Sequence, residues 1–192
     1  MISELGFKKG SIVECIVTTY NEDKSSNAAP MGIITENEKE VSINIHTSSD
    51  TYYNIIRNRC CVLNIVFDPY LFLKTALSGS GKAGAEPEVC GKEVGKSEVN
   101  APFLKDAAAY IEAVLVNHKE ETEFSHVRCS VSKVVVEKKH PFAVNRGLYA
   151  AVEAAIALSR GSRDIEGHMD IMRKALPQGE YSRIEKLLEE YI

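Results

Sequence analysis

Apolar and polar residues alternate over several short segments in the first two-thirds of the chain, and this period of two residues is typical of β-strands. The alternation is strict from Glu40 to His46, where Val41, Ile43 and Ile45 share one face. Cys60–Val66 is apolar almost throughout, which predicts a strand buried on both faces. The other segments predicted as strands are Glu14–Tyr20, Pro30–Thr35, Tyr110–Val116 and Val127–Glu137, the last two forming a hairpin across Lys119–Glu123.

A helical period replaces this pattern in two short segments and again near the C-terminus. Between them, Ser78–Glu98 is rich in glycine and poor in apolar residues, so we expect a loop there. The predicted helices are Thr51–Arg59, capped by Asp50 or Ser49, then Leu71–Leu77, Arg146–Arg160, Arg163–Leu176 and Glu180–Ile192.

These elements predict a mainly β fold of the α+β type. Residues 1–140 are expected to form an antiparallel barrel with a loop excursion at 78–98. Residues 141–192 are expected to form a C-terminal helical segment that packs on the barrel or on a dimer interface.

The composition is that of an ordinary globular protein, with 44% hydrophobic and 26% charged residues among 192. A net charge of −4 gives no basic surface, so nucleic acid is not an expected partner. No segment approaches the ~20 apolar residues that cross a bilayer, and no leader pattern precedes Gly10, so we expect a cytoplasmic protein without membrane contact. The five cysteines and five histidines lack the spacing of a disulfide framework or a metal site, so we expect reduced thiols and no metal.

Two polar segments, separated by one predicted strand, carry the strongest candidate chemistry. The first runs from Thr18–Asn21 into Asn27–Gly32, where small residues around a proline let a flat ring approach the backbone. The second, His46–Asn54, places several hydroxyl groups at a helix start, which suits an anion such as phosphate. Together the two segments predict a site for a flavin nucleotide.

Each segment also has a purely structural interpretation. Asn27–Gly32 is compatible with a hairpin exit in which Pro30 keeps an edge strand from pairing. One hydroxyl is enough to cap a helix, so the cluster at Ser48–Thr51 offers more than capping requires. Arg146 stands at a predicted helix start, where a cation is unfavourable unless it meets a carboxylate or a phosphate.

Other catalytic signatures fail. Gly91–Ser97 ends in G-K-S, but only three residues separate its glycines where a phosphate-binding loop needs four. No Ser/His/Asp, Cys/His or paired-carboxylate spacing can be assembled, so the catalytic residues are unknown and a bound cofactor would supply the chemistry. A haem in place of flavin would want a histidine ligand, for which His46 is the one candidate near the motif.

The chain resembles the split-barrel proteins that bind flavin mononucleotide (FMN), and within them a largely archaeal flavin-binding group of about this length. The resemblance covers nearly the whole chain and implies a six-stranded antiparallel Greek-key barrel. It also implies a homodimer with FMN near the subunit interface. Simple flavin reductases of this fold have no counterpart that matches the loop at 78–98. The segments that carry the resemblance are Glu14–Tyr20, N-A-A-P-M-G at 27–32, S-S-D-T-Y-Y-N at 48–54, and N-R-G before an alanine-rich helix from 145.

The same resemblance implies which residues bind FMN and what the protein does. The implied function is that of a flavin-dependent oxidoreductase or flavin reductase-like electron-transfer protein, with NAD(P)H or a small electron acceptor as its partner. The alternatives are a non-catalytic flavin carrier or storage module and a structural dimer without cofactor. The implied cofactor-binding residues are Asn27, with Ala28, Ala29, Pro30 and Met31 at the isoalloxazine ring; Thr47, Ser48, Ser49, Thr51 and Asn54 at the ribityl chain and phosphate; and Arg146, from either subunit.

Overall fold

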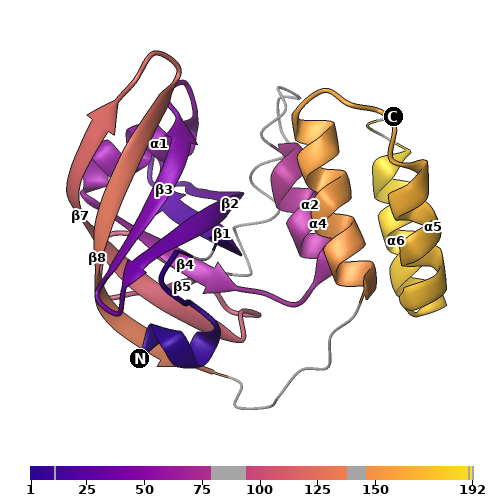
Figure 1. Ribbon diagram of the computed structural model, residues 1–192, viewed down its shortest axis with the longest axis horizontal. Coiled ribbons are helices and arrows are strands. Elements are labelled where there is room, and N and C mark those ends of the chain that lie inside the picture. The colour runs from indigo at the N-terminus through magenta and orange to yellow at the C-terminus, as the bar shows by residue number, and fades with distance from the viewer. Residues whose placement is uncertain (11, 79–93, 138–145, 190, 192) are drawn as a thin grey trace. The chain divides into compact units, whose positions relative to one another are not determined.

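The computed structural model describes residues 1–10, 12–78, 94–137, 146–189 and 191 (Figure 1). Most of the predicted loop at 78–98 therefore lies outside the described residues, as do Cys90 and Asn145. The elements are η1 (Ile2–Leu5), β1 (Ile12–Tyr20), β2 (Ser26–Asn37), β3 (Glu40–His46), α1 (Asp50–Asn58), β4 (Cys60–Ile65), α2 (Pro69–Ser78), β5 (Val94–Lys96), β6 (Pro102–Leu104), β7 (Ala109–Glu120), β8 (Phe124–Val136), α4 (Arg146–Ser159), α5 (Glu166–Ala175) and α6 (Gln178–Leu188).

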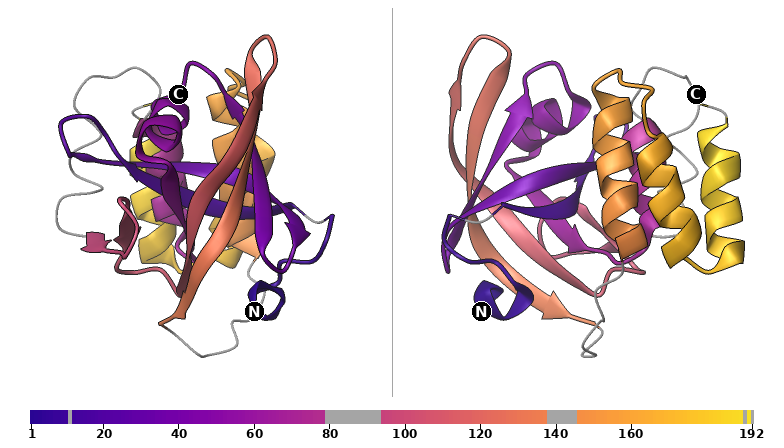
Figure 2. Two further views of the ribbon diagram at one scale, coloured as in Figure 1. Left: turned by 90° about the vertical axis from the view of Figure 1, so that its left-hand side faces the viewer. Right: turned by 45° about the vertical axis from the view of Figure 1, so that its right-hand side comes forward.

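Six strands close into a barrel in the order β1-β2-β3-β8-β7-β4, and each neighbouring pair is antiparallel. The predicted six-stranded antiparallel barrel is thus confirmed. Strands β7 and β8 form one long twisted hairpin along it (Figure 2). The predicted hairpin turn at Lys119–Glu123 is shorter than expected, because β7 continues to Glu120.

The barrel interior follows from the alternation of residues along the strands. Val17, Ile33, Ile43 and Ile111 come from four different strands, and all are fully buried in one apolar cluster. Each such side chain contributes about 1.5–3 kcal/mol by leaving water. Strand β4 is buried on both faces, as its unbroken apolar sequence predicts.

Two strand predictions need correction. Strand β2 begins at Ser26 rather than Pro30, because Ser26–Ala29 pairs with β1 despite its polar and small residues. Pro30 fits there because this half of β2 has a strand on one side only. The second correction concerns Val94–Lys96, which falls in the predicted loop but forms β5 and pairs with β6 as a two-stranded ribbon.

The chain divides into two compact units, one comprising residues 1–66 and 87–139 and the other residues 67–86 and 140–192. The second unit is helical, and it includes α2, which the sequence analysis counts within residues 1–140. Its helices bury a common core that includes Leu73, Ala151, Met172 and Ile184. The predicted helices are all present, although α5 begins at Glu166 and α6 at Gln178. None of the described helices has the length and apolar character needed to cross a membrane.

Thr35 provides a test of the barrel core. Its side chain is 2% exposed, and its hydroxyl has no hydrogen-bond partner among the described residues. An unsatisfied buried hydroxyl costs about 1–3 kcal/mol, and valine has the same shape without the hydroxyl. We therefore expect Thr35→Val to raise the free energy of unfolding by about 1 kcal/mol, measured by urea denaturation followed by circular dichroism. A lower free energy of unfolding for the variant would show that the hydroxyl has a partner in solution.

Candidate functional site

The first half of β2 is an open strand edge. Strand β1 pairs with β2 from Ile34 back to Ser26, but β3 joins β2 only as far as Ile33. Among the described residues, no strand pairs with the other side of Ser26–Gly32. Backbone N–H and C=O groups along such an edge need a partner, so a flat molecule with donors and acceptors on its rim would find them here.

The predicted ring-binding residues lie on this edge, and their side chains face two sides of the sheet. Ala28 and Pro30 stand opposite Thr18 and Ile16 of β1, and all the side chains from Ala28 to Met31 are half-buried. The Met31 side chain packs against the barrel core. A ring that touches this side chain would therefore lie on the core-facing side of β2. Gly32 is explained by its neighbours, because a Cβ there would come within 2.9 Å of Ile12 Cγ2.

A polar network joins this edge to α1. The Asn27 side-chain amide donates to the hydroxyls of Thr19 at 3.2 Å and Thr51 at 2.8 Å. Asn54 donates to the same Thr19 hydroxyl at 3.0 Å and to Asn21 Oδ1 at 2.7 Å. Thr51 and Asn54 are 2% and 3% exposed, so these contacts fix the helix against the hairpin. Three predicted residues, Asn27, Thr51 and Asn54, are thus brought together.

Arg57 adds a cation to this network, and the sequence analysis missed it. Its Nη2 donates to Asn54 Oδ1 at 2.6 Å and to the Tyr20 carbonyl at 2.9 Å. The guanidinium is exposed and carries further N–H groups, which suit an anionic ligand. Its position three residues after Asn54 puts the two on one helix face, a spacing that could have been found in the sequence.

The hydroxyl turn between β3 and α1 is held largely by internal contacts. Ser49 is the N-cap of α1, because its hydroxyl accepts from the Tyr52 amide at 3.2 Å. The Thr47 hydroxyl donates to the Glu123 carbonyl at 3.1 Å, and Ser48 Oγ lies 2.8 Å from His46 Nδ1. The structural interpretation therefore accounts for Ser49. Thr47 and Ser48 would have to exchange these partners to contact a ligand.

The first turn of α1 still presents donors. The backbone amides of Asp50 and Thr51 have no acceptor among the described residues, as expected at the start of a helix. Such amides bind anions, although the exposed carboxylate of Asp50 in the same turn weakens the local field for an anion.

Among the predicted cofactor-binding residues, Arg146 is the one that belongs to the helical unit and not to the barrel unit. It begins α4 in the helical unit and its side chain is exposed. Its role at the site stays a prediction.

Burial raises the pKa of a tyrosine and two cysteine thiols in the barrel core. Burial, and then the hydrogen bond to Glu120, raise the pKa of Tyr52. A hydrogen bond with Cys129, together with burial, raises the pKa of the Cys61 thiol, and burial raises that of Cys15. These thiols pack as apolar groups, as predicted. Among the described residues, no group of three or more His, Cys, Asp or Glu side chains is arranged to hold a metal ion.

Solved structures with the same fold include several flavoproteins. The FMN-bound protein MM1853 from Methanosarcina mazei, assigned to DUF447, is 22% identical, with a TM-score of 0.80 over 99% of this chain and 100% of that one. The flavin reductase HpaC, solved with NADP⁺, is 17% identical, with a TM-score of 0.56 over 73% of this chain and 88% of that one. Flavoredoxin from Methanosarcina acetivorans is 16% identical, with a TM-score of 0.56 over 68% of this chain and 72% of that one.

These likenesses establish the split-barrel fold that the sequence predicts, and a sequence family covers most of the barrel. The family model described as "Protein of unknown function (DUF447) N-terminal domain" matches residues 13–138, which is more than half of the chain. The chain therefore belongs to the DUF447 family.

Proposed function

We propose that this protein binds FMN at the open edge of β2 and at the start of α1. The observation that carries the proposal is the unpaired stretch Ser26–Gly32 next to a buried polar network on α1. Binding of FMN by MM1853, which is assigned to the same family, supports the choice of cofactor.

The residues present fit the parts of such a ligand. The backbone of Ala28–Met31 would pair with the donors and acceptors on the rim of the ring, and the small side chains leave room for it. Asn27, Thr51 and Asn54 would bind the ribityl hydroxyls by exchanging partners within their network. Thr47–Ser49, the free amides of α1 and Arg57 would hold the phosphate, with Arg146 completing the site from its own or a second subunit.

We further propose a flavin-dependent oxidoreductase or flavin reductase-like electron-transfer protein that acts as a cytoplasmic homodimer. When bound, the flavin supplies the hydride or electron chemistry, and this chain holds it and excludes water. The HpaC and flavoredoxin folds support this class, and the NADP⁺ complex of HpaC supports a nicotinamide donor. The helical segment would pack on the barrel or at the dimer interface. A non-catalytic flavin carrier or storage module is the second candidate.

The test begins with an absorption spectrum of the purified protein and mass identification of what is released on denaturation. Flavin bands and released FMN, or saturable binding of added FMN by stripped protein, would support the cofactor. A colourless protein that fails to bind added FMN would overturn it.

Holoprotein is then mixed with NADH or NADPH without oxygen. Rapid loss of the flavin absorbance identifies an electron-transfer enzyme, whereas inertness with both donors favours the carrier. Sedimentation of the same samples tests the homodimer.

A further inference from the structure

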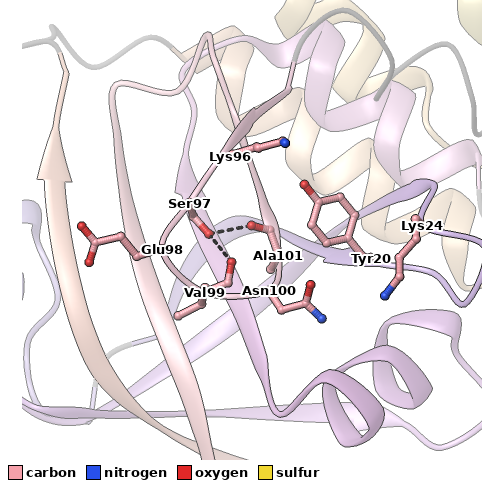
Figure 3. A pocket seen from close by; sticks show the side chains of 8 residues that line it. All are labelled: Tyr20, Lys24, Lys96, Ser97, Glu98, Val99, Asn100 and Ala101. Carbon is pink, nitrogen blue, oxygen red and sulfur yellow. Dashed lines mark hydrogen bonds between the residues drawn. The ribbon is translucent and has the colours of Figure 1, made fainter.

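A pocket of about 610 Å³ lies in the barrel unit, between the β1–β2 hairpin and the loop that joins β5 to β6 (Figure 3). Its volume is within the range of small-molecule sites. None of the cofactor residues predicted from the sequence belongs to its lining. The lining residues are Tyr20 and Lys24 of the hairpin, Lys96 at the end of β5, and Ser97, Glu98, Val99, Asn100 and Ala101 of the loop.

The loop wall of the pocket is fixed by hydrogen bonds. Ser97 Oγ lies 2.9 Å from the Val99 carbonyl and 2.6 Å from the Ala101 carbonyl, as the dashed lines in Figure 3 mark. The Glu98 amide donates to Glu112 of β7 at 3.1 Å. A wall held in this way keeps its shape before a ligand arrives, which lowers the entropy cost of binding.

The lining has an excess of positive charge. Lys24 and Lys96 are exposed, and neither forms a salt bridge within the part of the chain that the structure describes. Glu98, the carboxylate of the lining, is bound by Lys133 at 2.5 Å. In Figure 3 the Lys96 side chain extends toward Tyr20, whereas Glu98 points in the opposite direction. Two ammonium groups without a salt bridge among the described residues therefore remain at the pocket, and the carboxylates of Glu22 and Asp23 precede Lys24 in the same turn.

Lys24 reaches the pocket from the turn of the β1–β2 hairpin. Its φ of 70° lies in the left-handed region, where glycine or asparagine is favoured and a lysine is strained. Neighbouring Asp23 directs its carboxylate to the amide and hydroxyl of Ser25, at 2.9 and 2.6 Å. The turn accounts for this conformation, because the Lys24 amide donates to the Asn21 carbonyl at 3.1 Å and the Asn21 amide donates to the Ser25 carbonyl at 2.9 Å.

Tyr20 gives the pocket an aromatic wall. Its carbonyl accepts from Arg57 at 2.9 Å and from Asn58 at 2.7 Å, so its backbone is anchored on α1. Its ring is half-buried and stacks on no other ring among the described residues. Because Thr19 and Tyr20 are successive residues of β1, they face opposite sides of the strand. The Tyr20 ring therefore points away from the network around Thr19, although Arg57 contacts both Asn54 of that network and the Tyr20 carbonyl.

We propose that this pocket binds an aromatic anion of the nucleoside phosphate class. The ring of the ligand would stack on Tyr20, and its phosphate groups would be bound by Lys24 and Lys96. The pocket lies next to the proposed flavin site, because Arg57 donates to the Tyr20 carbonyl, but its lining includes none of the side chains assigned to FMN above.

ADP is the probe, and isothermal titration calorimetry of the full chain, with and without added FMN, is the measurement. ADP is expected to bind with a Kd in the micromolar range and more tightly than adenosine, which lacks charge, or pyrophosphate, which lacks a ring. Raising the salt from about 0.05 to about 0.5 M is expected to weaken ADP binding severalfold, since the charges are exposed. Pyrophosphate that binds as tightly as ADP would contradict a ring contact and with it the proposed ligand class.

Lys24→Gln combined with Lys96→Gln is expected to weaken ADP binding about tenfold. The matched control is Lys9→Gln combined with Lys39→Gln. Both lysines are exposed in the barrel unit and form no salt bridge among the described residues, so this change should leave the Kd for ADP within about twofold.

Tyr20→Leu is expected to weaken ADP binding about fivefold, and Tyr149→Leu, at an exposed tyrosine of the helical unit, is its control. No heat of binding at millimolar ADP, or equal Kd values for the lysine variant and its control, would overturn the proposal. FMN affinity that is unchanged in the lysine variant, while ADP affinity falls, separates this pocket from the flavin site.

Discussion

Thr51→Val is expected to weaken FMN binding about tenfold, which corresponds to about 1.4 kcal/mol. The Thr51 hydroxyl is buried and accepts from Asn27, and its proton has no acceptor among the described residues. It is therefore placed to donate to a ligand while Asn27 holds its oxygen. Valine keeps the shape, removes the donor and leaves the Asn27 amide without this acceptor. The Kd is measured by the quenching of FMN fluorescence on titration with stripped protein.

The matched control is Thr35→Val, which makes the same change in β2 away from the open edge. It should leave the Kd for FMN within about twofold, since it removes a hydroxyl that binds nothing among the described residues. Asn27→Leu, which removes both amide contacts to Thr19 and Thr51, should weaken FMN at least as much as Thr51→Val. If Thr51→Val and Asn27→Leu both bind FMN as tightly as the wild type, the network does not contact the cofactor.

Asn64→Leu is expected to lower the free energy of unfolding by about 3 kcal/mol. Asn64 is fully buried in β4 and connects three segments. Its amide donates to the Ile16 carbonyl at 2.8 Å and to the Thr18 hydroxyl at 2.9 Å, and its Oδ1 accepts from the Leu104 amide at 2.8 Å. Leucine would leave the Ile16 carbonyl and the Leu104 amide buried without these partners, at about 1–3 kcal/mol each.

Urea denaturation measures this loss, with Asn44→Leu as the control. Asn44 is exposed in β3 and contacts His126 on the surface, so its replacement should change the free energy of unfolding by less than about 0.5 kcal/mol. Equal urea midpoints for the two variants would show that the Asn64 contacts do not hold the β5–β6 ribbon to the barrel.

The sequence predicts those parts of the fold that local pattern determines. The alternation in Glu40–His46 identifies a strand because it shows which residues face the core. The unbroken apolar run of β4 identifies a strand that is buried on both faces. Ser49 was among the expected caps of α1 because one hydroxyl before an apolar period is a local signal.

The remainder depends on contacts between distant segments, which no local pattern reveals. Ser26–Ala29 has little intrinsic preference for a strand and becomes one by pairing with β1. The link from Asn27 to Thr51 crosses 24 residues, and the link from Asn54 to Thr19 crosses 35. The hydroxyl turn looked richer in free donors than it is, because partners such as Glu123 come from the other end of the barrel sequence. Arg57 was missed for a different reason: a cation on a short helix is normally a solvated surface group.

The open edge of β2 also bears on how the protein behaves at high concentration. An unpaired strand edge is a template on which a strand of another molecule can add, so an empty site is a point of self-association. Pro30 removes one N–H from this edge and so interrupts such a ladder in the middle. A ligand on the same edge would complete the protection that the proline begins, so a bound cofactor would also keep strands of further molecules from adding to this edge.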